Sequence, residues 1–344
     1  MFANGSLDAR PGSILAWTSG AVGDTLLAFP ALQALRDWAP DAIITVIGRP
    51  DCLGLALDLG LVDQVEDTDG PFAATLFNGD RLKRIPALDL AVIWSSASDL
   101  IRRSLLQAGV SYVIAAPPRG AEGVHQSDYL LSCLEPLGVV PAWKPLRWSP
   151  AVQADGDGTI GSRRVARQVL IHAGAGARWK RWPLTQFLTL AAEYRDAGYR
   201  ILWSFGEADA DIRDGLAADP FIAETLPRVP LRELAAVIAR CSLVVSGDTG
   251  IAHLGSLCGT PTLTIFGPTD ARRWRPLGPL AHILEATVAC GGAWLPPVSS
   301  VEDAPQPSLR RCPPTAGDVC SCLCAVEPRT VFERSISLLT ASCS

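Results

Sequence analysis

The chain has 344 residues, of which 48% are hydrophobic and 19% charged, and its formal net charge is −5 at pH 7. This composition supplies ample apolar surface for packed cores and excludes an intrinsically disordered chain. The acidic balance is a poor match for nucleic acid, whose phosphates require a basic face. The chain is longer than a domain with a single ordinary core, so we expect two domains of about 150 residues each.

The sequence contains no run of about 18 uncharged apolar residues, the length that would span a bilayer. Residues 1–17 lack the basic start and apolar centre of a signal peptide. We therefore expect either a fully cytoplasmic protein or a cytoplasmic protein that also makes peripheral contact with the inner face of the plasma membrane.

In the first half, short apolar runs alternate with a helical pattern. We predict a helix at 24–39 and strands at 13–18, 42–48, 88–94 and 111–116. Strands and helices alternating at this spacing form a doubly wound parallel sheet. The stretch 141–164 is rich in Pro, Gly and polar residues and has little periodicity, which favours a linker between domains.

The same alternation restarts after the linker. We predict strands at 167–173, 199–205, 242–247 and 261–267, and helices at 182–198, 231–241, 249–259 and 328–341. The expected organisation is a domain at 1–150, a linker at 151–166, a second domain at 167–326 with a Cys/Pro-rich segment at 287–326, and a terminal helix within 327–344. The fold class is α/β, with two Rossmann-like doubly wound domains that face a cleft at the carboxyl ends of their strands.

A glycine-containing turn, Gly20 to Asp24, directly follows the first predicted strand. The glycines permit a tight strand-to-helix turn, which places Asp24 near the start of the next helix. Asp24 is either a helix cap or, at a strand end that faces the cleft, a general base.

A second glycine-rich stretch, HAGAGARWKRWP at 172–183, follows the first strand of the second half. Gly174 and Gly176 expose backbone N–H groups, and Arg178, Lys180 and Arg181 add positive charge. This combination suits a phosphate or diphosphate. The stretch lacks the ending of a Walker A loop and the third glycine of a dinucleotide fingerprint. A solvated basic turn is the alternative.

A third motif, SGDTGIAH at 246–253, lies at another strand-to-helix junction. Its turn directs amide N–H groups at the end of the strand, where the helix N-terminus is electropositive. Thr249 and His253 are four residues apart and share a helix face. Beside Asp248, Thr249 and a second glycine-rich loop, His253 is interpreted as a hydrogen-bond donor to phosphate, whereas a buried core histidine is the alternative.

Three stretches in this order resemble the bacterial lipopolysaccharide heptosyltransferases of glycosyltransferase family nine: GDTLLAFPALQALR, HAGAGARWKRWP and SGDTGIAHLGSLCGTPTLTIFGPTDARRW. The resemblance implies the GT-B arrangement of two Rossmann-like domains. It also implies an inverting transfer from a nucleotide-diphosphate sugar, usually ADP-heptose, which the C-terminal domain binds while the N-terminal domain binds the acceptor.

The resemblance also implies roles for individual residues. Asp24 matches the catalytic carboxylate, and Lys180 matches the lysine that contacts the donor diphosphate. The donor-binding DTG-x-x-H motif corresponds to Asp248, Thr249, Gly250 and His253. An acidic residue that binds the donor ribose is expected after Gly206, and Glu207 and Asp211 are both candidates.

Five cysteines lie within 35 residues of one another: Cys290, Cys312, Cys320, Cys322 and Cys324. In a reducing compartment such a cluster is more often a metal or redox site than a disulfide framework. If the segment is extended, Cys320, Cys322 and Cys324 share one face, and Cys290 or Cys312 would complete a structural Zn or Fe site. Reduced, unliganded thiols are the favoured alternative.

The predicted reaction is a single displacement that requires no cofactor. Asp24 removes a proton from the acceptor hydroxyl, while Lys180, the backbone amides of 248–250 and His253 stabilise the leaving diphosphate. The predicted acceptor is the lipopolysaccharide core, a glycolipid. A protein or small-molecule acceptor is one alternative, and a nucleotide-binding module without transferase activity is another.

Overall fold

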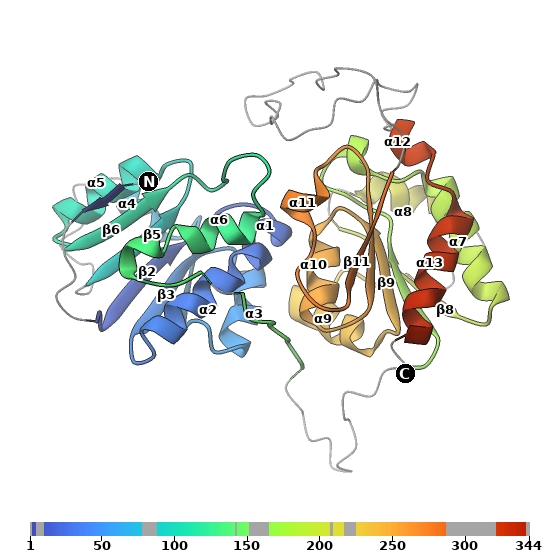
Figure 1. The fold of residues 1–344 in the computed structure, drawn as a ribbon, viewed down its shortest axis with the longest axis horizontal. Helices are drawn as coiled ribbons and strands as arrows, with labels where there is room; N and C mark the ends of the chain where they lie inside the picture. The colour runs from blue at the N-terminus through green and yellow to red at the C-terminus, as the bar shows by residue number, and fades with distance from the viewer. Residues whose placement is uncertain are drawn as a thin grey trace, which may run out of the picture. The chain divides into compact units, whose positions relative to one another are not determined.

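The computed structural model describes residues 2–4, 10–77, 88–141, 143–150, 165–206, 209–216, 225–286 and 321–341. The chain divides into two compact units, Met1–Trp148 and Ser149–Ser344, each built on its own sheet (Figure 1).

The sheet of the first unit has the strand order β1-β6-β5-β2-β3-β4. Its strands are β1 (Phe2–Asn4), β2 (Ser13–Trp17), β3 (Ile43–Gly48), β4 (Gln64–Asp67), β5 (Leu90–Trp94) and β6 (Tyr112–Ala116). All pair in parallel except β1, which is antiparallel to β6. The chain leaves β2 toward β3 and β4 and later returns to β5 on the other side. The switch point, where open α/β sheets bind ligands, therefore lies between β2 and β5.

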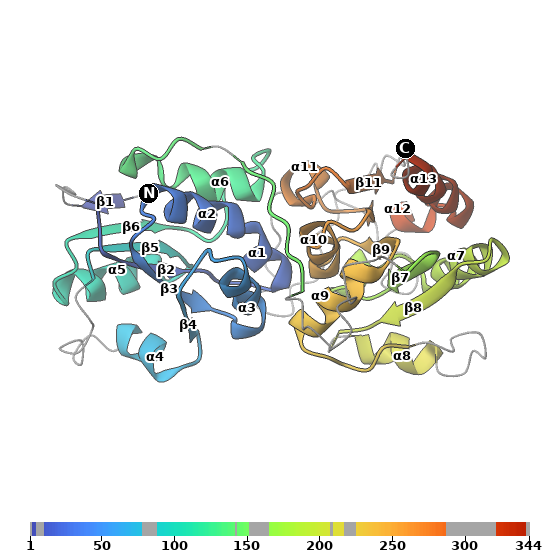
Figure 2. The same cartoon turned by 90° about the horizontal axis from the view of Figure 1, so that it is seen from below.

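Helices cover both faces of this sheet. They are α1 (Val22–Leu27), α2 (Phe29–Trp38), α3 (Pro50–Asp58), α4 (Pro71–Phe77), α5 (Ser98–Gln107) and α6 (Gln126–Ser132). One layer contains α1, its neighbours α2 and α3, and α6, which lies beside α2 (Figure 2). The helices α4 and α5 contact each other. Buried side chains of α4 and α5 pack on Leu15, Trp17 and Ile93 of the strands.

The predicted helix 24–39 is wrong in one respect, because it consists of α1 and α2, which meet at Ala28. Pro30 occupies the first turn of α2. In one continuous helix its ring would clash with the carbonyl of Leu26, whereas the start of a helix tolerates proline.

The second unit has the strand order β11-β10-β9-β7-β8, with every pair parallel. The strands are β7 (Gln168–His172), β8 (Arg200–Ser204), β9 (Leu243–Gly247), β10 (Thr262–Phe266) and β11 (Ala281–Glu285). The helices are α7 (Leu184–Asp196), α8 (Ala210–Leu216), α9 (Leu231–Arg240), α10 (Gly250–Leu257), α11 (Ala271–Trp274), α12 (Ser321–Cys324) and α13 (Pro328–Ala341). Here the switch point lies between β7 and β9.

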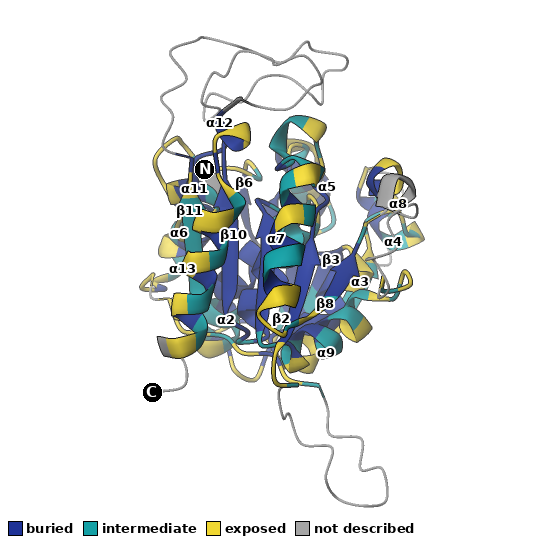
Figure 3. Cartoon of the chain, turned by 90° about the vertical axis from the view of Figure 1, so that its right-hand side faces the viewer, coloured by how far each residue is buried: buried dark blue, intermediate teal, exposed yellow. Residues whose placement is uncertain are grey.

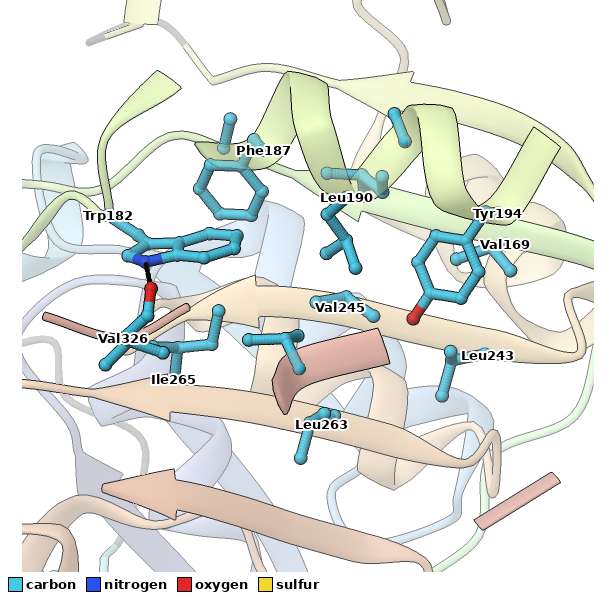
Figure 4. Packing of buried hydrophobic residues seen from close by; sticks show 14 of the residues in the cluster. Val169, Trp182, Phe187, Leu190, Tyr194, Leu243, Val245, Leu263, Ile265 and Val326 are labelled. Carbon is cyan, nitrogen blue, oxygen red and sulfur yellow. Dashed lines mark hydrogen bonds between the residues drawn. The ribbon is translucent and has the colours of Figure 1, made fainter. Parts of the chain in front are cut away.

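The core of the second unit lies between its strands and α7, with α13 packed against α7 (Figure 3). Phe187, Leu190 and Tyr194 of α7 point toward the apolar side chains of the strands (Figure 4). The Tyr194 hydroxyl lies 2.5 Å from the Ser335 Oγ of α13. The terminal helix therefore packs as part of the second unit.

The predicted fold class is confirmed, since both units are doubly wound α/β structures. The predicted strands agree with β2, β3, β5, β6 and β7 to β10 within two residues at each end. The sequence analysis did not identify β1, β4 or β11. No helix within the described ranges is long and apolar enough to span a membrane.

Candidate functional site

Two loops leave neighbouring strand ends at the switch point of the second unit. We name them the β7 loop (173–181) and the β9 loop (248–249). They are joined by an ion pair, in which the Lys180 Nζ donates to the Asp248 Oδ2 at 2.8 Å. Lys180 also lies over the ring of Trp179, with the nitrogen 5.7 Å from its centroid. The sequence motifs that contain Lys180 and Asp248 therefore meet in one place.

Asp248 is held as an anion. Its side chain is 9% exposed, whereas that of Lys180 is 27% exposed. Burial by itself raises the pKa of the Asp248 carboxyl, but the charge and hydrogen bond of Lys180, together with Thr269 and His253, hold this pKa below its ordinary value. A fixed ammonium thus lies at the switch point, with one side still open to solvent.

The helix α10 begins directly after the β9 loop. Thr249 is its N-cap, and the Thr249 hydroxyl accepts a hydrogen bond from the Ile251 N–H at 3.3 Å. Gly250 is the first helical residue, and His253 is buried one turn later. The helix therefore directs its electropositive end toward the loops at the switch point.

A buried carboxylate that the sequence analysis missed, Asp209, organises the β7 loop. Its Oδ2 accepts from the Gly206 N–H at 2.8 Å, and its Oδ1 accepts from the Ala175 N–H at 3.2 Å and from Arg181 at 3.3 Å. Asp209 is only 3% exposed. Its signal in the sequence is the alternation of acidic residues in Glu207-Ala208-Asp209-Ala210-Asp211.

Gly174 is required for this arrangement. A Cβ at this position would lie 1.9 Å from the Asp209 Oδ2 and 2.1 Å from its Cγ. At Gly176, by contrast, a Cβ would meet nothing within 4 Å. The glycine at 174 permits close approach of a carboxylate that holds the loop, while the one at 176 lies on the exposed part of the loop.

The two arginines of the β7 loop already have acidic partners. Arg181 pairs with Asp209 and, at 2.9 Å, with Asp211, and Arg178 lies 3.3 Å from Asp211. Asp211, a candidate for ribose binding, therefore lies against the basic loop. Glu207, the other candidate, is outside the described residues.

His172, at the end of β7, is a further buried group below the loop. Its Nδ1 lies 3.1 Å from the Ser204 Oγ, and its Nε2 lies 3.8 Å from the Asp209 Oδ2. Burial lowers the pKa of His172 below its ordinary value, against the opposing charge of Asp209.

In the first unit, Asp24 lies in the first turn of α1, three residues after the N-cap Ala21. Its Oδ2 accepts from the Ala21 N–H at 3.0 Å, and its Oδ1 lies 3.9 Å from Arg119. The turn depends on Gly20, which has φ +118° and whose Cβ would clash with Asp24. Asp24 therefore caps the helix with one oxygen and presents the other beside a cation at the end of β2.

The cysteine hypothesis is partly wrong. Cys322 is buried in the core and Cys324 is exposed, because Ser321–Cys324 forms a helical turn in which the side chains do not alternate as in a strand. Cys290, Cys312 and Cys320 lie outside the described residues. Among the residues that the structure does describe, no group of three or more His, Cys, Asp or Glu could hold a metal ion.

Comparison with known proteins relates the chain to one family. Residues 146–292 match the model of "Glycosyltransferase family 9 (heptosyltransferase)". Lipopolysaccharide heptosyltransferase 1 of Salmonella typhimurium is 36% identical over 92 residues, which are 26% of this chain and 29% of that protein. The alignment thus spans less than a third of this relative. Lipopolysaccharide heptosyltransferase 3 of Escherichia coli is 26% identical over 299 residues, covering 74% of this chain and 83% of that protein.

A solved structure, the ADP-heptose lipopolysaccharide heptosyltransferase II of E. coli, has the same fold. Its TM-score is 0.70 at 18% identity, over 96% of this chain and 100% of that one. The predicted resemblance to this family is therefore confirmed, and the fold is that of the heptosyltransferase structures.

We predict that Gly174→Ala destabilises the second unit, because Asp209 must move and leave buried donors without acceptors. Each such donor costs about 1–3 kcal/mol. Urea unfolding of the purified variant measures the loss. Gly176→Ala is the matched control and should remain within about 0.5 kcal/mol of the unsubstituted protein. Equal stability of the two variants would contradict the role of Asp209.

We also predict a pH dependence from His172. Because its pKa in the folded protein lies below the unfolded value of about 6.5, its contribution to stability is full above that pH and is lost as the pH falls. The free energy of unfolding should rise between pH 5 and 7, with a slope of at most about 1.4 kcal/mol per pH unit from this group. His172→Asn should flatten the slope, and His282→Asn, at a less buried site, should change it less. An unchanged slope in His172→Asn would refute the assignment.

Proposed function

We propose that this chain, which residues 146–292 and its fold relate to glycosyltransferase family 9, is an inverting glycosyltransferase that moves heptose from ADP-heptose to a lipopolysaccharide core acceptor. The observation that carries the proposal is the Lys180–Asp248 pair, which fixes an ammonium at a switch point beside the N-terminus of α10. A nucleotide diphosphate is the ligand that this chemistry suits.

In this proposal the second unit binds the donor. The exposed side of the Lys180 ammonium contacts the diphosphate, while Asp248 holds this ammonium from its buried side. The backbone amides of 248–250 and the His253 imidazole add donors to the same phosphates. These groups stabilise the negative charge that grows on the diphosphate as its bond to the sugar breaks, so they act on the transition state more than on the bound substrate.

The first unit supplies the base and binds the acceptor. The Asp24 Oδ1 takes the proton of the acceptor hydroxyl, whose oxygen forms a bond to the anomeric carbon. The bond from that carbon to the diphosphate breaks on the opposite face, and its electron pair leaves with ADP. The geometry supports this role because Oδ2 is engaged by the Ala21 N–H, which fixes the carboxylate while Oδ1 does not cap the helix.

The experiment that tests the proposal has two steps. The purified protein is first heated with ADP-heptose, ADP or UDP-sugars, because a ligand at 100 times its dissociation constant adds about 2.7 kcal/mol of stability. Transfer of heptose to a lipopolysaccharide core acceptor is then followed by mass spectrometry. Stabilisation by ADP without transfer to any glycolipid, protein or small-molecule acceptor would leave the chain as a nucleotide-binding module.

We predict that Asp24→Asn removes most transfer and leaves ADP binding intact. Asparagine keeps an oxygen for the Ala21 N–H, so the helix cap is preserved while the base is lost. A general base contributes about 10²–10⁴-fold to the rate. Asp99→Asn, at an exposed residue in the first turn of α5, is the control and should retain full activity. Near-full activity of Asp24→Asn would reduce Asp24 to a helix cap.

We predict that Lys180→Ala weakens the binding of ADP more than that of AMP, because AMP lacks the second phosphate. Affinities are measured by calorimetry and corrected for the folded fraction, since Asp248 loses its partner. Arg178→Ala removes a more exposed cation from the same loop and should change the ADP to AMP ratio much less. If both substitutions weaken the binding of ADP equally, the β7 loop acts only through its total charge.

A further inference from the structure

A segment distant in sequence packs against two of the loops at the site. We name Cys322–Val326, which lies just before α13, the return segment. Cys322, Leu323 and Val326 are buried in the core of that unit, whereas Cys324 and Ala325 are exposed. The return segment is therefore anchored along one side.

Leu323 lies directly on Gly267, the first residue after β10. A Cβ on Gly267 would come 2.5 Å from the Leu323 Cγ and 2.7 Å from its Cδ2. Gly267 opens the β10 loop (267–270), in which Thr269 is 3% exposed and lies beside the Asp248 carboxyl. The fully buried Leu323 thus sets how far the β10 loop can move toward the interior.

The other end of the return segment contacts the residues that directly follow the β7 loop. The Trp182 Nε1 donates to the Val326 carbonyl at 3.1 Å (Figure 4), and the Gln186 Nε2 donates to the Cys324 carbonyl at 2.8 Å. Trp182 is 1% exposed, its ring packs edge-on against Phe187 at 4.7 Å, and it lies two residues after Lys180. The same five residues therefore contact structures on both sides of the Lys180–Asp248 pair.

We propose that the return segment is a clamp that positions the diphosphate site, with Leu323 as the positioning residue for the β10 loop and the Val326 carbonyl as the anchor of Trp182, at the end of the β7 loop. This inference rests on the proposed function for its ligand, and it goes beyond it by assigning a role to residues that touch neither substrate. A displacement of about 1 Å in such supporting structure can reduce a rate about 10²-fold.

Leu323→Ala tests the clamp against Leu338→Ala, which removes the same atoms from α13 in the same core. We expect Leu323→Ala to weaken ADP binding about tenfold or more and to lower kcat further, per folded molecule. Leu338→Ala should leave both within about twofold, because it lies outside the return segment. Equal effects of the two truncations on ADP binding would overturn the proposal. If Leu323→Ala does not fold, the milder pair Leu323→Val and Leu338→Val is compared in the same way.

A compensating pair of substitutions separates positioning from simple loss of packing. Gly267→Ala should weaken ADP binding, because its new Cβ pushes against Leu323. In the double variant Gly267→Ala, Leu323→Ala the clashing atoms are gone, so we expect ADP affinity to recover above that of either single variant. Losses that simply add in the double variant would contradict a direct contact that sets the loop position.

Hydrogen exchange without ligand distinguishes failure of the clamp from failure of the proposed function. Amides at 175–182 and at Gly267, Thr269 and Asp270 should exchange faster in Leu323→Ala than in Leu338→Ala at equal global stability. If the unsubstituted protein binds no ADP, the proposed function is lost, and this comparison still decides the clamp. Unchanged exchange in both loops would overturn it.

Discussion

The Lys180–Asp248 ion pair joins residues 68 positions apart, and the strand order of the second sheet brings them together. β7 and β9 are neighbours although β8 and the helices α7, α8 and α9 separate them in the chain, so their loops leave the sheet side by side. A buried carboxylate needs a partner, and an ammonium near the interior needs an anion. Each member of the pair therefore fixes the other, which preorganises a positive charge at the strand ends.

The surrounding residues support this pair from three directions. Asp209 holds the β7 loop through the Ala175 N–H and the Arg181 side chain, and it can do so only because residue 174 has no side chain. Thr249 caps α10 and so fixes the start of the helix beside Asp248. The return segment packs on the β10 loop and on Trp182. Because these contacts are buried and hydrogen-bonded, the loops are set before a ligand arrives, which lowers the entropy lost on binding.

The two units present opposite charges at their switch points. In the first unit, the Ser19 hydroxyl donates to the Trp94 carbonyl at the end of β5, and the turn that follows Ser19 presents the Asp24 carboxylate. In the second, the open group is an ammonium. A base for an acceptor hydroxyl and a cation for a leaving diphosphate are the two functions that an inverting transfer needs, so the proposed reaction assigns one chemical task to each unit.

Much of this structure follows from sequence. Short apolar runs located eight strands within two residues at each end, and the predicted helix 328–341 agrees with α13. The glycine-rich motifs and their family resemblance located Lys180, Asp248 and Asp24 after the carboxyl ends of strands. In a parallel sheet these ends all lie at the same edge, which is where ligands bind.

Only the tertiary structure decided which of these groups turn inward. Spacing alone could not select Asp209 over Asp211 as the buried carboxylate, because the choice depends on Gly174, 35 positions earlier in the sequence. Nor could it show that Cys322 enters the core while Cys324 faces solvent, or that Leu323 meets Gly267. Those contacts join segments far apart in the chain, and burial at such positions is set by what packs against them, whereas local periodicity reports only the residue's own element.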